Sequence, residues 1–167
     1  MVNDVASALH EDQMICFALS LLSLQMKAPV AAGKELDFWV GSWKVFVGKE
    51  LAGTDTVVKS LDGFAITETW HGTRPGDEGM SLFYYMPAKK QWKQVWVTPY
   101  GAYKEKVSAP VKDGIRFQGT AFGPKGRNVA DRTTLTKLSG GRVRQVIERA
   151  ADSKTWKVGF DATYVKS

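Results

Sequence analysis

The chain has 167 residues and a net charge of +6, and aromatic residues make up 11% of it, including six Trp and eight Phe. So many large apolar side chains exclude an intrinsically disordered protein and predict one domain with a substantial core. A single Cys excludes an internal disulfide framework, and two His residues exclude a metal cluster built from His and Cys.

The first 32 residues differ in character from the rest of the chain. Residues 15–24 form an apolar run that is too short to cross a bilayer but suits the apolar region of a signal peptide. Residues 30–32 supply the small side chains of a cleavage site, whereas the residues before the run are acidic, unlike an export signal. Two interpretations follow. Either residues 14–32 are a signal peptide and the protein is exported to the periplasm, or residues 9–27 form an amphipathic helix on a cytoplasmic protein.

The domain expected over residues 33–167 begins with an aromatic stretch that sets its pattern. After Gly41, the side chains of Trp43, Val45 and Val47 alternate with polar or small residues, as in a half-buried strand. Gly41 allows a tight backbone turn, and we expect Trp43 to anchor the core just after it.

Short alternating segments separated by Asp-Gly, Pro-Gly and Gly-Gly turns continue to the end of the chain. This pattern predicts an all-β fold in which consecutive hairpins close into a single antiparallel up-and-down barrel, because closure removes exposed sheet edges. We expect ten strands, at residues 43–49, 54–60, 64–71, 80–86, 91–98, 103–109, 114–121, 129–137, 142–150 and 156–165.

The period-two alternation also assigns side chains to the inner and outer faces of the barrel. The predicted inner face is strongly aromatic, yet it carries four polar residues. In the strand at 103–109, the pattern places Glu105 inside and the neighbouring Lys104 and Lys106 outside. Burying an unpaired polar group costs about 1–3 kcal/mol, so these groups require mutual hydrogen bonds, internal water or a ligand. The four are Glu68, Gln94, Glu105 and Gln145.

From these faces we predict an internal cavity with aromatic walls and a few polar groups that orient a ligand. The residues expected to bind the ligand are Glu68, Trp70, Gln94, Trp96, Gln145 and Tyr164.

Several motifs of the domain form a recognisable set. They are Phe38-Trp-Val-Gly-Ser-Trp43, Glu68-Thr-Trp70, Trp92-Lys-Gln-Val-Trp-Val97, Val143-Arg-Gln145, and Thr155-Trp156 followed by Phe160-Asp161 and Tyr164. Together they resemble a bacterial family of lipocalin-like domains of unknown function. The resemblance covers roughly residues 35–166, and it implies a calycin-type antiparallel β-barrel, often behind a signal peptide, with no established catalytic residues.

Other kinds of chemistry have weaker sequence support. Glu68 and Glu105 are the candidates for an acid–base pair, because burial would raise their pKa values towards neutrality. His71 is the one histidine of the domain through which haem could bind, as in some lipocalin-type barrels, but its parity places it outside or at the rim. Lysines alternate with aromatic residues along 89–104, yet on opposite faces, which argues against a stacking surface for single-stranded nucleic acid.

The leading functional hypothesis is a non-enzymatic barrel that binds a small apolar or aromatic molecule. One alternative is a small barrel enzyme, of the isomerase or cyclase type, that uses a buried carboxylate. Another is a structural or interaction domain whose lumen is filled by its own side chains. The sequence leaves the ligand and the oligomeric state open.

Overall fold

The computed structural model describes residues 33–167, and within them it contains ten strands that hold most of the described residues. Both interpretations of the N-terminal segment, signal peptide or edge helix, concern residues outside the described part. The strands are β1 (Gly41–Val47), β2 (Glu50–Ser60), β3 (Ala65–Gly72), β4 (Glu78–Met86), β5 (Gln91–Val97), β6 (Tyr103–Val111), β7 (Gly114–Phe122), β8 (Asn128–Lys137), β9 (Val143–Ala150) and β10 (Lys157–Lys166).

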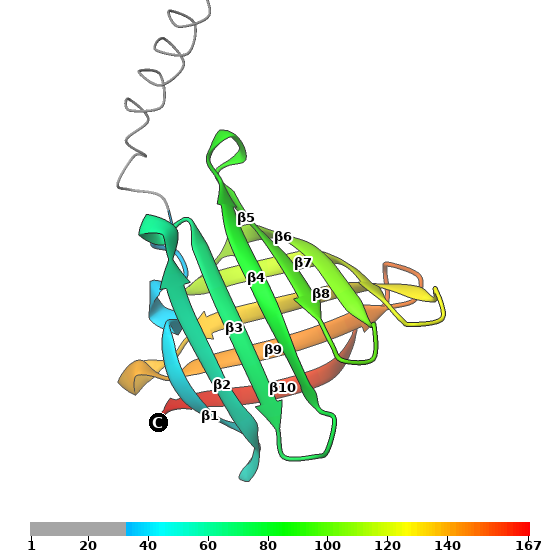
Figure 1. Ribbon diagram of the computed structural model, residues 1–167, viewed down its shortest axis with the longest axis horizontal. Helices are drawn as coiled ribbons and strands as arrows, with labels where there is room; N and C mark the ends of the chain where they lie inside the picture. Colours follow the sequence, from blue (N-terminus) through cyan, green and yellow to red (C-terminus); the bar gives the residue numbers. More distant parts are fainter. Residues whose placement is uncertain (1–32) are drawn as a thin grey trace, which may run out of the picture. The chain divides into compact units, whose positions relative to one another are not determined.

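Each strand pairs in antiparallel fashion with its neighbour in sequence, and β1 pairs with β10 to close the barrel (Figure 1). This confirms the predicted all-β, up-and-down, ten-stranded fold. All ten expected strands are present. The largest boundary difference is in β2, which begins at Glu50 because its pairing with β1 continues through a bulge after Val45.

Four short 3-10 turns connect or precede the strands. They are η1 (Asp37–Trp39), η2 (Leu61–Gly63), η3 (Pro87–Lys89) and η4 (Ser139–Gly141). None of the helices within residues 33–167 has the length and hydropathy required to cross a membrane.

Because consecutive strands are antiparallel, the connections between them lie alternately at one end of the barrel and at the other. The end that carries η1–η4 is called here the closed end, because residues before β1 pack into it. Trp39 lies edge-to-face against Phe83, with ring centroids 5.4 Å apart, and against Tyr164 at 6.4 Å. Trp43 is fully buried and donates a hydrogen bond from Nε1 to the carbonyl of Trp39 at 2.9 Å. Trp43 is thus a core residue, as predicted, and Gly41 before it has a φ of +139°, a value that favours glycine.

The opposite end, called here the open end, carries the β1–β2, β3–β4, β5–β6, β7–β8 and β9–β10 connections. Apolar packing is concentrated in the half of the barrel near the closed end, where Leu36, Trp92, Phe117 and Leu135 are all buried. Polar side chains lie on the inner face beyond this apolar layer, and they form the base of the cavity described next.

Candidate ligand-binding cavity

A cavity of about 1200 Å³ occupies the part of the barrel towards the open end. Its lining comes from strands all around the barrel and from the loops at the open end. One of the sequence-based alternatives was a lumen filled by its own side chains. The cavity shows that the lumen is not filled throughout. All six residues predicted to face a ligand lie along this cavity, namely Glu68, Trp70, Gln94, Trp96, Gln145 and Tyr164.

The face assignment of β6 was wrong. Lys104 and Lys106 point into the barrel, whereas Glu105 lies outside, with its side chain 48% exposed and 3.1 Å from Lys93. The apolar residues Tyr103 and Val107, which suggested the opposite orientation, are exposed on the outer surface. The two lysines can point inwards because Asp131 on β8 supplies a carboxylate for their ammonium groups. Glu105 is therefore not a cavity residue.

A cluster of four charged residues is called here the Asp131 cluster, and it consists of Asp131, Lys104, Lys106 and Arg149. Its three cations line the cavity. Asp131 is fully buried, and its Oδ1 lies 3.0 Å from Nζ of Lys106. Its Oδ2 lies 3.5 Å from Nζ of Lys104 and 3.3 Å from Nε of Arg149. Lys106 also donates to Oγ1 of Thr133 at 2.5 Å. The carboxylate of Asp131 thus forms ion pairs with three cations.

The pKa values in the Asp131 cluster reflect the competition between burial and charge. Burial lowers the pKa of Lys106 to about 8, although the charge of Asp131 opposes the shift. Burial likewise lowers the pKa of Lys104. For Asp131, burial alone would raise the pKa, but the charges of Lys106 and Lys104 outweigh it and hold the pKa below its ordinary value. Asp131 is therefore a carboxylate at neutral pH.

A second group of polar side chains surrounds Glu68, which is 4% exposed. Ser81 donates from Oγ to Oε2 of Glu68 at 2.5 Å, and Gln94 donates from Nε2 to Ser81 Oγ at 3.0 Å. Asp55, on the neighbouring strand, is 1% exposed and lies beside Glu68. Neither carboxyl oxygen of Asp55 has a hydrogen-bond partner among residues 33–167, so its charged form would be costly to bury.

The proton in this pair belongs on Asp55. Burial, followed by the adjacent charge of Glu68, raises the pKa of Asp55 to about 9. Burial also raises the pKa of Glu68, whereas hydrogen bonding from Ser81 and the charge of Lys106 oppose that shift. The sequence-based prediction missed Asp55. Asp55 is two residues from the buried Val57 on β2, so the alternation of side chains places both on the inner face. This spacing could have identified Asp55 as an inward residue.

Two amides complete the polar part of the lining. The hydroxyl of Tyr164 donates to Oε1 of Gln145 at 3.0 Å, and burial raises the pKa of this phenol well above its ordinary value. Oε1 of Gln94 is buried, and among residues 33–167 it has no hydrogen-bond partner. Because Gln94 lines the cavity, this oxygen is placed to accept a hydrogen bond from a bound molecule or a water.

The apolar wall of the cavity lies nearer the open end. Trp70 packs edge-to-face on Phe160 with centroids 6.2 Å apart, and its Nε1 donates to Oδ1 of Asp77 at 3.2 Å. Trp96 and Ile147 extend this wall on β5 and β9. The hydrogen bond to Asp77 fixes the Trp70 ring against the β3–β4 connection, so this part of the wall has a defined orientation.

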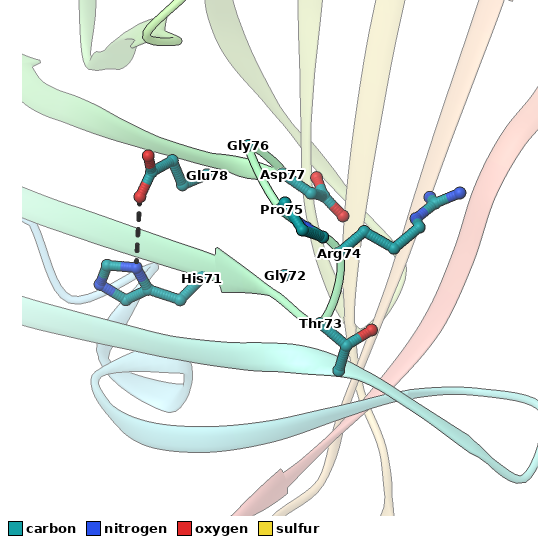
Figure 2. Close-up of a pocket in the computed structure, with 8 residues that line it drawn as sticks. All are labelled: His71, Gly72, Thr73, Arg74, Pro75, Gly76, Asp77 and Glu78. Atoms are coloured by element: carbon teal, nitrogen blue, oxygen red, sulfur yellow. Dashed lines mark ion pairs between the residues drawn. The ribbon is translucent and has the colours of Figure 1, made fainter.

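The β3–β4 connection forms part of the rim and borders a smaller hollow of about 350 Å³, lined by residues 71–78 (Figure 2). Figure 2 shows the side chains of His71 and Glu78 facing each other on one side of this hairpin, with His71 Nδ1 3.8 Å from Glu78 Oε2, while Arg74 extends towards the other side. His71 is exposed and is not among the residues that line the large cavity, which agrees with its predicted position outside or at the rim.

Within residues 33–167, no group of three or more His, Cys, Asp and Glu side chains has an arrangement suited to a metal ion. Protein-family models give no match to the chain, and a search of curated proteins finds no significant relative. The class of the protein is thus defined by its fold and cavity, as a closed ten-stranded antiparallel barrel hollowed towards one end. The resemblance to bacterial lipocalin-like domains stays a prediction.

Proposed function

We propose that the protein binds a small molecule with an apolar or aromatic body inside the barrel. The observation that carries this proposal is the two-part lining of the 1200 Å³ cavity. Trp70, Trp96 and Phe160 provide an aromatic wall. The buried polar base presents Oε1 of Gln94, which has no hydrogen-bond partner within the described part of the chain. Ligand pockets in proteins are concave and mostly apolar, with a few convergent polar groups that fix orientation. Common pocket volumes are about 300–1,000 Å³, so the space suffices for a ligand together with bound water.

The energetic argument has two parts. Transferring apolar surface from water to the aromatic wall is favourable by about 25 cal/mol per Å², which supplies affinity without directional contacts. The polar base supplies selectivity, since a ligand that leaves Gln94 or Glu68 unpaired in the occupied cavity forfeits hydrogen bonds that water provides in the empty one. Kinship with the bacterial lipocalin-like domains is part of this proposal, and the shared motifs and the barrel support it.

A neutral fluorescent probe, phenylnaphthylamine, tests the proposal. We expect it to bind with one-to-one stoichiometry and to quench tryptophan emission, because Trp70 and Trp96 lie on the cavity wall. The variant Ala121→Trp places a large ring in the cavity and should abolish binding. The matched control Gln118→Trp adds the same ring to an exposed position of the same strand and should bind normally. Equal binding by both variants would show that the probe sits elsewhere.

The natural ligand can be sought by native mass spectrometry of protein purified from its source. We expect a bound small molecule that is retained in the Gln118→Trp variant and lost in the Ala121→Trp variant. A co-purifying molecule that survives in both variants would not occupy this cavity.

A second candidate function is acid–base catalysis by Glu68, and the adjacent buried carboxyl groups of Asp55 and Glu68 favour it. Glu68 reaches the cavity, its pKa is raised by burial, and Asp55 stands behind it as a proton donor. A base in this setting suits proton abstraction next to a carbonyl group, the chemistry of an isomerase or cyclase. The test is deuterium incorporation into cyclic ketones in heavy water. Incorporation must depend on Glu68 and disappear in Glu68→Gln, and an equal rate in the two proteins would exclude this candidate.

A further inference from the structure

The Asp131 cluster carries more positive than negative charge. Lys104, Lys106 and Arg149 all contact the one carboxylate of Asp131. The side chains of Lys104 and Lys106 are 14% and 1% exposed, whereas that of Arg149 is 56% exposed. Three cations on one carboxylate leave positive charge unbalanced, and part of it is buried. Burying an unpaired charge is costly, so such a surplus favours an anionic partner.

The geometry shows where that partner would bind. Nζ of Lys104 and Nε of Arg149 both approach the same oxygen, Oδ2 of Asp131, at 3.5 and 3.3 Å. Two cationic groups that share one oxygen lie close enough to each other to bind one further anionic group together. Lys106 is 1% exposed and is held by Asp131 and Thr133, so its role is to fix Asp131 rather than to meet a ligand. Lys104 and Arg149 both line the cavity, and their remaining N–H groups are available on that side.

We infer that the cavity is selective for an organic anion, whose carboxylate or sulfonate binds between Lys104 and Arg149 while its apolar body lies against the wall of Trp70 and Trp96. This inference rests on the proposed function, because it names the chemical class of the ligand in the same cavity. Charge-assisted hydrogen bonds to an anionic group are roughly twice as strong as those between neutral groups. Burial lowers the pKa of Lys104, and an anion bound beside it would restore the charged form.

The two acids whose charges act on Lys104 are already engaged. Asp131 on β8 is shared among three cations, and Glu68 on β3 accepts a hydrogen bond from Ser81. The other acids of the cavity lining lie towards the open end, and they are Glu50, Asp77, Glu78 and Asp161.

Two probes that differ only in charge test this inference. Anilinonaphthalene sulfonate is phenylnaphthylamine with an added sulfonate group, so both present the same rings to the cavity wall. We expect the anionic probe to bind the intact protein roughly tenfold more tightly than the neutral probe. Lys104→Gln and Arg149→Gln should each weaken the anionic probe by about tenfold and change the neutral probe by less than about twofold. Lys93→Gln, which removes a cation from the outer face of the adjacent strand, should leave both probes unchanged.

Each outcome separates this inference from the proposed function. One-to-one binding of the neutral probe, with no preference for the anionic one and no effect of Lys104→Gln, would overturn the inference and leave the proposed function intact. Equal losses for both probes in Lys104→Gln would also overturn it, because the lysine would then matter through packing rather than charge. Failure of both probes to bind would contradict the proposed function itself.

Discussion

Nζ of Lys106 on β6 lies 3.0 Å from Oδ1 of Asp131 on β8, across the intervening strand β7. The residue between them is Gly119, which pairs with Lys106 on one side and with Asp131 on the other. Because Gly119 has no side chain, the lysine reaches over β7 to the carboxylate two strands away. A Cβ at this position would meet the carbonyl oxygen of Glu105 at 2.1 Å, so the pairing itself requires glycine here.

Asp131→Asn should destabilise the barrel strongly. The substitution leaves Lys106 buried and without a carboxylate, and breaking a buried ion pair in this way costs about 3–5 kcal/mol. Urea unfolding measures the change in free energy. The control is Glu105→Gln, which removes the exposed partner of Lys93 and should cost about 0–1 kcal/mol. Similar losses in the two variants would show that Lys106 is not held by Asp131.

Asp55 should make the protein less stable as the pH rises. Its pKa is about 9 in the folded barrel, whereas its ordinary value is 3.8. Between these values the folded state holds a proton that the unfolded state has lost, so the free energy of unfolding falls with increasing pH. The raised pKa of Glu68 contributes with the same sign. Lys106 has the opposite effect, but only above about pH 8, where the folded state loses its proton first.

Asp55→Asn should therefore flatten the dependence of stability on pH between about pH 5 and pH 7. Asparagine keeps the shape of the protonated acid. The measurement is urea unfolding at several pH values in this window. Asp152→Asn is the control, since the pKa of Asp152 is lowered to about 2 and its titration lies below the window. An unchanged slope in Asp55→Asn would mean that Asp55 is ionised in the folded protein.

Trp43→Ala should remove a large part of the stability of the closed end. Trp43 is fully buried, packs on Tyr164 with centroids 6.1 Å apart, and bonds to the carbonyl of Trp39. Truncating a buried tryptophan costs about 3–5 kcal/mol. Trp156→Ala is the matched control, because that ring is partly exposed against Arg132, with the guanidinium 4.2 Å from its centroid. Its loss should cost about 1 kcal/mol. Equal urea midpoints for the two variants would refute the role of Trp43 as an anchor.

The strands and the barrel follow from local features of the sequence. Period-two alternation, Asp-Gly turns and the Gly41–Trp43 pair identify the elements and most inner faces, because these signals act within one or two strands. The same parity placed Glu68, Gln94 and Gln145 together with the aromatic wall.

The orientation of β6 could not be obtained in this way. Tyr103 and Val107 look like core residues in sequence, and the cost of burying Lys104 and Lys106 is offset only by Asp131, two strands further along the chain. That compensation depends on the register of three paired strands, which no local pattern encodes. Parity with Val57 could have placed Asp55 inside, but its raised pKa depends on burial and on the charge of Glu68 on the neighbouring strand, which the pattern of β2 alone does not encode.

The indole N–H signals of the tryptophans in a proton–nitrogen correlation spectrum show whether a ligand enters the open half of this barrel. We expect phenylnaphthylamine to shift the signals of Trp70 and Trp96, which line the cavity. The signals of Trp39 and Trp43, buried in the closed end, should remain in place. Shifts confined to Trp156, or no shifts at saturating probe, would show that the cavity does not bind the probe.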